Sequence, residues 1–183
     1  TESRHAETRA LLTARGATSL GEGPARSWEQ GRFGAPYLRD ALLAAGALCE
    51  TLETATSWSN VSALKAAVTT ALIESLAASG TNALVLCHIS HVYPTGASLY
   101  FTVVAGARGD SLDEVIAQWR AAKTAASDAI MATGGTITHH HAVGTDHRPW
   151  MADEVGDLGV EVLRAVKSCL DPAGVLNPGK LIP

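Results

Sequence analysis

Aromatic residues, charge and long apolar runs are all scarce in this chain of 183 residues. Aromatic side chains make up only 5% of the total, so a core must be built mainly from Ala, Leu and Val. We find no run that approaches the roughly 20 uncharged apolar residues needed to span a bilayer. The net charge of -4 argues against general nucleic-acid binding, because neutralising phosphates requires a basic surface.

Cysteine is also rare, and Cys49, Cys87 and Cys169 lie far apart without a CxxC pair. This pattern argues against a disulfide framework or a cysteine zinc site and predicts buried thiols in a reducing compartment. The remaining composition, 46% hydrophobic and 17% charged, is typical of one globular domain with a real core. The chain begins TESRHAETRALL, without Met or a secretion signal, and we expect it to be a fragment of a longer protein.

Helical and strand-like segments alternate along the sequence. Apolar spacing predicts helices over 3–14, 36–46, 59–80, 111–134 and 149–170. Apolar runs and alternation predict strands over 48–56, 82–93, 97–107 and 135–138. We expect Ser57 or Ser59 to cap the third helix and Ser111 to cap the fourth. The Gly, Pro and Ser content of 16–28 predicts a loop, and 171–183 is expected to be an irregular tail.

The order of these elements over 48–138 is β-α-β-β-α-β, which predicts an α+β fold. We expect a ferredoxin-like antiparallel sheet with two helices packed on one face through Ala-rich stripes, and flanking N- and C-terminal helices. The chain then divides into N-terminal helices and a loop (1–47), the ferredoxin-like core (48–138), and a histidine loop, last helix and tail (139–183). Such a fold hosts many activities, so it does not predict function.

Three consecutive histidines, His139, His140 and His141, are the most unusual feature of the sequence. Imidazole titrates near neutral pH, so the cluster indicates acid–base catalysis or metal binding. In an extended loop, His139 and His141 would share one face and His140 would point away. A solvated loop is the alternative interpretation, and the spacing is not that of an ordinary zinc site.

Tyr100 and Arg39 are the other candidate site residues. Alternation in the strand over 97–107 places Tyr100 on the face opposite Leu99 and Phe101, where its hydroxyl needs a partner if it is buried. Arg39 follows Leu38 on a predicted helix and is either a surface cation or a clamp for phosphate or carboxylate. The glycines of SLGEGP lack the strand and helix context of a phosphate-binding loop.

Four stretches taken together resemble one family: RFGAPYLRD (32–40), ETLETATSWS (50–59), GGTITHHHAVG (134–144) and LDPAGVLNPGK (170–180). They resemble the C-terminal half of flavin-linked oxidases of the vanillyl-alcohol-oxidase type, and most of all the alkyldihydroxyacetonephosphate synthase branch. The resemblance covers the chain from about residue 16. It implies that residues 1–183 form the cap domain over the substrate site, while an N-terminal domain absent from this chain binds most of the FAD.

The resemblance also implies roles for the candidate residues. Tyr100 matches a catalytic tyrosine that takes part in proton transfer, and Arg39 matches an arginine that meets the anionic group of the substrate. His139, His140 and His141 match a histidine loop that the family needs for catalysis near the flavin.

Further positions match the family less completely. Asn177 and Lys180 match a tail segment that lies near the cofactor. Ala142 is a departure, because the family usually has glycine after the third histidine, and a glycine would give the loop more backbone freedom. No role is assigned to His147 or Arg148.

A neighbouring branch, the flavin-dependent 2-hydroxyacid dehydrogenases, typically holds a divalent metal through a His-x-G-x-G-N-x-His turn and a Glu-His-Gly loop. The matching stretch here runs from His91 to Tyr100, so Tyr100 replaces the second histidine. His140 and His141 replace the Glu-His pair. Because a carboxylate and an imidazole are missing, we expect no metal.

The function implied by the resemblance is an FAD-dependent exchange of the acyl group of acyl-dihydroxyacetone phosphate for a fatty alcohol, a step of ether-lipid synthesis. The expected partners are the FAD-binding domain of the same protein and a phosphorylated or lipid-like substrate, with a homodimer also considered. Two alternatives stay open: an FAD-dependent oxidase or dehydrogenase of a small hydroxy acid or alcohol, and a non-catalytic ferredoxin-like binding module. The expected location is cytoplasmic, with peripheral membrane contact also considered.

Overall fold

The computed structural model describes residues 2–183 apart from the side chain of Ala35, and the chain divides into two units at Ala41 and Leu42. The first unit holds α1 (Glu2–Ala14), α2 (Gly23–Gly31) and most of α3 (Ala35–Ala44). The helices expected over 3–14 and 36–46 are confirmed. The loop expected over 16–28 is wrong in its second half, because α2 begins there with a proline in its first turn, where the missing N–H is not needed.

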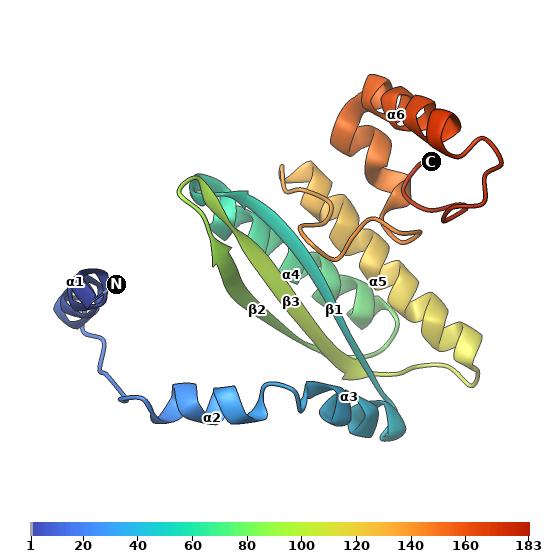
Figure 1. Cartoon of the computed structure of the whole chain (residues 1–183). Helices are drawn as coiled ribbons and strands as arrows, with labels where there is room; N and C mark the ends of the chain where they lie inside the picture. Colours follow the sequence, from blue (N-terminus) through green and yellow to red (C-terminus); the bar gives the residue numbers. More distant parts are fainter. Residues whose placement is uncertain (1) are drawn as a thin grey trace. The chain divides into compact units, whose positions relative to one another are not determined.

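The second unit is built on a three-stranded antiparallel sheet in the order β1-β3-β2. Its strands are β1 (Ala47–Ser57), β2 (Ala83–Val92) and β3 (Gly96–Gly106). Helices α4 (Val61–Ala78) and α5 (Leu112–Ala132) both cover the same face of the sheet (Figure 1). The α+β class and the one-sided helical layer expected from the sequence are therefore confirmed.

A fourth strand over 135–138 was expected and is wrong for the described residues, which form three strands. This segment lies along the free edge of β1, but only one backbone hydrogen bond joins them, from the Thr136 N–H to the Ala55 carbonyl. The side chains of Thr54 and Thr56 donate to the carbonyls of Thr136 and Gly134. These side-chain bonds replace the ladder that a strand would need.

The core lies between the sheet and its two helices. Alternate residues of β3 and a stripe along α4 and α5 are buried together: Leu99, Phe101, Val103, Leu64, Val68, Leu72, Leu76, Ala122, Ala126 and Ile130. The expected Ala-rich stripe is found on α5, whereas the buried stripe of α4 consists of leucine and valine. Trp58–Ala78 is long and apolar enough to cross a membrane by length and composition, contrary to our expectation, but its buried side chains make it the core helix here.

The ends of the helices follow the sequence only in part. Ser111 caps α5 as expected, accepting a hydrogen bond from the Glu114 N–H while the Glu114 side chain returns one to the Ser111 backbone. The expected caps at Ser57 or Ser59 are wrong. A 3-10 turn, Trp58–Asn60, precedes α4, so Asn60 occupies the N-cap position of this helix. The last helix is α6 (Met151–Leu170), which follows a 3-10 turn and is kinked at Gly156.

All three cysteines are free, but the burial expected for them is only partly found. Cys49 and Cys87 are half-buried in the sheet, where burial raises the pKa of the Cys87 thiol above its ordinary value. Cys169 is exposed near the end of α6, so the expectation of a buried thiol is wrong there.

Candidate functional site

The face of the sheet that the helices leave open carries three polar side chains in one row. Tyr100 in the central strand is directly opposite Glu53 on β1 and His88 on β2. Because side chains alternate along a strand, these residues face away from Leu99 and Phe101, which are fully buried under the helices. The face predicted for Tyr100 is therefore confirmed.

A β-bulge brings a further histidine to this face. The register between β2 and β3 shifts between Ser90 and Val92, and His91 adopts a positive φ of 38°. The His91 Nδ1 atom consequently lies 3.6 Å from the Glu53 Oε1 atom and 3.2 Å from the Ser98 hydroxyl. A regular strand would have sent consecutive side chains to opposite faces.

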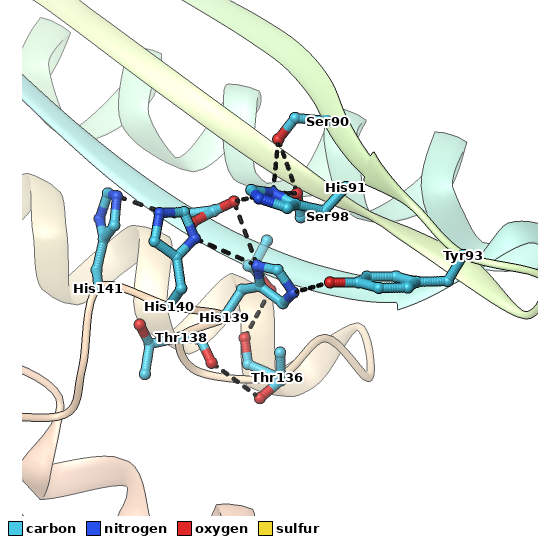
Figure 2. Close-up of polar contacts among 11 residues, drawn as sticks. Ser90, His91, Tyr93, Ser98, Thr136, Thr138, His139, His140 and His141 are labelled. Carbon is cyan, nitrogen blue, oxygen red and sulfur yellow. Dashed lines mark hydrogen bonds and ion pairs between the residues drawn. The ribbon is translucent and has the colours of Figure 1, made fainter.

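The three consecutive histidines converge on the same carboxylate. His139 Nδ1 lies 3.4 Å from Glu53 Oε1, and His141 Nε2 lies 3.8 Å from Glu53 Oε2. His140 Nδ1 is in direct contact with Glu53 Oε2. Figure 2 shows the imidazoles gathered between the β2–β3 hairpin and the loop after α5. The expectation that His140 points away is wrong, because the loop is bent at all three histidines and not extended.

Glu53 is the central residue of this cluster, and our sequence analysis missed it. It is 1% exposed, and neither carboxylate oxygen makes a hydrogen bond of good geometry within residues 2–183. The ion pairs of Glu53 in the described chain are all with histidine. The available signal was an acidic residue in the middle of a predicted strand that is otherwise apolar and threonine-rich apart from Glu50. A carboxylate at such a position needs a specific partner.

Tyr93 is a second residue that the sequence did not single out. Its hydroxyl lies 3.0 Å from the Nε2 atom of His139, and the two rings are 5.8 Å apart (Figure 2). The hairpin that carries Tyr93 is fixed in turn by Trp58, whose indole N–H donates to the Tyr93 carbonyl at 2.9 Å. Tyr93 therefore fixes the His139 ring at Nε2, on the side of the ring opposite the nitrogen that faces Glu53.

Tyr100 and His141 form the part of the site suited to proton transfer. Their rings meet edge to face with centroids 5.4 Å apart, and Tyr100 is half-buried. Burial lowers the pKa of His141 below its ordinary value; Glu53 opposes this effect, while His140 and Lys123 add to it. The lowered pKa favours the neutral His141 ring, which has one nitrogen that can accept a proton.

His147 and the tail hold the histidine loop in its bent form. The buried His147 ring donates from Nδ1 to the Ala142 carbonyl at 2.9 Å, and burial, followed by Lys123, lowers the pKa of His147. Arg148 donates to the Gly179 carbonyl at 2.9 Å, and the Leu181 N–H donates to the Gly144 carbonyl at 2.8 Å. These contacts give His147 and Arg148 the structural role that the sequence left open.

The remaining candidate residues are placed differently. Lys180 lines a cleft together with His141 and Lys123, so the tail does return toward the histidine loop. Asn177 lies in the preceding turn at a positive φ of 46°, and its carbonyl accepts a hydrogen bond from the Lys180 N–H. Arg39 lies on α3, in the first of the two units.

Residues 2–181 match the family described as FAD linked oxidases, C-terminal domain, and the chain belongs to this family. Among the relatives that it resembles over most of its length are alkyldihydroxyacetonephosphate synthases. It is 33% identical over 183 residues to the enzyme of Trypanosoma brucei brucei, and 34% identical over 173 residues to that of Dictyostelium discoideum. These alignments cover 100% and 94% of this chain but only 29% and 28% of the relatives.

A solved structure of an alkyldihydroxyacetonephosphate synthase matches the fold with a TM-score of 0.69 at 25% identity. The match covers 97% of this chain and 29% of that one. The chain therefore spans about three tenths of the length of the relatives and structures it matches. The residues of the cluster lie within this C-terminal region of a flavin-linked family.

Proposed function

We propose that the protein carrying this chain is an FAD-dependent enzyme that exchanges the acyl group of acyl-dihydroxyacetone phosphate for a fatty alcohol. The observation that carries the proposal is the juxtaposition of Tyr100 with His141 on the open sheet face, beside the buried Glu53. The similarity to alkyldihydroxyacetonephosphate synthases over nearly the whole chain supports this choice of reaction. In this proposal residues 1–183 are the cap that closes the substrate site.

The residues of this chain are suited to line one side of a flavin ring, but not to supply the main binding site for FAD. Its glycine-rich stretch lacks the context of a pyrophosphate-binding loop, so another part of the protein would hold the phosphates of FAD. The open sheet face, in contrast, offers the apolar side chains of Leu84 and Leu86, both exposed, and the half-buried Tyr100. When bound, FAD supplies the reactive ring at which the group exchange takes place.

The work of the chain itself is to move a proton and to hold the substrate. Tyrosine has an ordinary pKa near 10, so its hydroxyl is a poor base at neutral pH without a neighbour that takes its proton. The neutral His141 ring is placed to serve as that neighbour. Arg39, which matches the family's anion-binding arginine, would hold the substrate phosphate through paired hydrogen bonds.

Replacing Tyr100 by phenylalanine tests the proposal. Tyr100→Phe removes only the hydroxyl, so the protein should fold normally while kcat for the acyl-for-alkyl exchange falls by about 10²-fold or more. Turnover is measured with the complete, FAD-loaded protein, acyl-dihydroxyacetone phosphate and a long-chain alcohol. Tyr37→Phe, at a tyrosine that is 80% exposed, is the matched control and should keep full activity.

Two outcomes would sink the proposal. Wild-type turnover by the Tyr100→Phe protein would show that the Tyr100 hydroxyl takes no part in proton transfer during the reaction. Reduction of the flavin by small hydroxy acids, with no exchange on the phosphorylated ketone, would favour the alternative oxidase or dehydrogenase.

A further inference from the structure

The segment that leads into the three consecutive histidines is held by two different elements. The Thr136 N–H donates to the Ala55 carbonyl of β1 at 3.0 Å. The Glu154 carboxylate of α6 accepts a hydrogen bond from the Thr136 hydroxyl at 2.5 Å and another from the Ile137 N–H at 2.9 Å. Thr136 and Ile137 are therefore clamped between the sheet edge and the last helix, directly before the histidine loop.

The bond to Ile137 meets a need of the buried backbone. Ile137 is 2% exposed, so its N–H group is shielded from water. A buried N–H group without an acceptor is strongly unfavourable, because it loses its hydrogen bonds to water and gains nothing in exchange. Glu154 supplies the acceptor from outside the sheet.

The first turn of α6 gives Glu154 a fixed position. The backbone departs from helical geometry at Gly156, with φ 74° and ψ 163°, so this turn is set off from the rest of the helix. The buried side chain of Met151 anchors the turn. The indole N–H of Trp150 anchors it further by donating to Asp128 Oδ1 on α5 at 2.8 Å. The Glu154 carboxylate is thus tied to the helix from which the segment emerges.

Stabilisation of its own helix is the ordinary role of a glutamate in a first turn, through the positive end of the helix dipole. Asp153 lies in the same turn with an exposed side chain and is placed for that role. Glu154 is half-buried, and its two oxygens accept from Thr136 and Ile137. The main effect of Glu154 therefore falls on the segment before the histidines.

A shift of this segment would reach the proton-transfer pair. His141 follows Ile137 by only four residues, and its ring meets that of Tyr100 with centroids 5.4 Å apart. The C-terminal end of the loop is held separately, by the bond between His147 Nδ1 and the Ala142 carbonyl. With that end fixed, the direction of the His141 ring depends on where the N-terminal end is held.

We propose that Glu154 is a positioning residue, which holds Thr136 and Ile137 so that the His141 ring stays aligned with Tyr100 for proton transfer. This inference rests on the proposed function. Glu154 acts through the backbone of the loop and is not itself a catalytic residue. The scale of the expected effect is set by geometry, because a misplacement of about 1 Å can lower a rate by about 10²-fold.

The test compares Glu154→Ala with Glu154→Gln in the complete, FAD-loaded protein. Alanine removes both acceptors, so kcat for the acyl-for-alkyl exchange should fall by about 10-fold or more with KM little changed, because orientation is lost and not substrate binding. Glutamine keeps an oxygen for the Ile137 N–H, and its amide can donate to the Thr136 hydroxyl, so it should restore most of kcat. Asp153→Ala, which removes an acid from the same turn, is the matched control and should keep full activity.

A double variant separates positioning from general damage. The Tyr100→Phe protein has already lost the proton transfer that Glu154 serves, so adding Glu154→Ala should lower kcat by much less than it does in the wild-type protein. Circular dichroism establishes that each variant is folded. If Glu154→Ala does not fold, Thr136→Val removes one of the two bonds with little change of shape and should likewise lower kcat without raising KM.

Hydrogen exchange tests the clamp without substrate. The amides of residues 134–138 should exchange faster in Glu154→Ala than in the wild-type protein, and at nearly the wild-type rate in Glu154→Gln. If the folded Glu154→Ala protein keeps wild-type kcat, or if these amides exchange as slowly as before, the positioning role is wrong while the proposed function stands. A wild-type protein that catalyses no acyl-for-alkyl exchange would instead refute the proposed function, and with it the catalytic part of this inference.

Discussion

At the scale of single residues, backbone conformation matters as much as side-chain chemistry in this site. Ala142, directly after the third histidine, adopts a positive φ of 64°, and its carbonyl accepts the hydrogen bond from His147. A left-handed conformation costs a residue with a Cβ atom about 1–2 kcal/mol, and glycine avoids this cost. The departure from the family pattern noted in the sequence therefore falls at a strained position.

Replacing this alanine by glycine should relieve the strain. We expect Ala142→Gly to raise the free energy of unfolding by about 1 kcal/mol, as measured by urea denaturation of the complete protein. Ala63→Gly is the matched control, because Ala63 lies on an exposed position of α4, where glycine should lower stability by about 1 kcal/mol. Equal losses at the two positions would show that Ala142 is not strained.

The role proposed for Arg39 also belongs to the residue scale. Lysine keeps the positive charge but loses the planar pair of donors that fits phosphate. We expect Arg39→Lys to raise KM for the phosphorylated substrate much more than it lowers kcat, in steady-state assays of the complete protein. Arg9→Lys on α1 is the control and should change neither constant. An unchanged KM for Arg39→Lys would remove Arg39 from the substrate site.

At the scale of elements, the three strands and the long helices followed their sequence patterns, but the segment over 135–138 and the stretch that forms α2 did not. The alternation of β3 correctly separated Tyr100 from Leu99 and Phe101, because that pattern is local. The strand expected over 135–138 does not form, because the side chain of Thr54 donates to the Thr136 carbonyl and that of Thr56 donates to the Gly134 carbonyl just before the segment. No pattern within a four-residue segment reports what the neighbouring strand will do.

The hairpin between β2 and β3 depends on one close approach of two backbones. A Cβ atom on Gly96 would lie 2.0 Å from the Thr56 carbonyl oxygen, which belongs to β1 and cannot move aside easily. We expect Gly96→Ala to lower the free energy of unfolding by about 2 kcal/mol or more, measured by chemical denaturation. Gly31→Ala, with open space around it, should leave Tm unchanged or slightly raised. A harmless Gly96→Ala substitution would contradict this arrangement of the hairpin.

At the scale of the whole molecule, the open sheet face is the surface that the proposed function requires to be covered. Leu84 and Leu86 on β2 are more than half exposed, and the candidate site lies on the same face. The relatives are more than three times as long as this chain. In the proposed enzyme, the FAD-binding domain supplies the opposite wall of the site.

The chain alone should therefore bind no FAD with useful affinity. Its open sheet face can line one side of the flavin site, but the chain has no loop that binds the pyrophosphate. Contacts to the pyrophosphate supply much of the affinity for a dinucleotide. The measurement is calorimetric titration of the purified 183-residue chain with excess FAD. Stoichiometric binding with Kd near or below about 1 µM would overturn this view of the chain as a partial site.

The sequence by itself determined the α+β class, the face of Tyr100 and, through resemblance, the flavin-linked family. Each of these depends on short-range periodicity or on motifs that are contiguous in the chain. Only the tertiary structure decided that Glu53, His91 and the three histidines meet at one point. That meeting depends on strand register, a bulge at His91 and a bent loop held by His147, and these arise from contacts between segments up to about 90 residues apart. Periodicity records which side of its own element a residue takes, and it does not record which distant residue will be placed opposite.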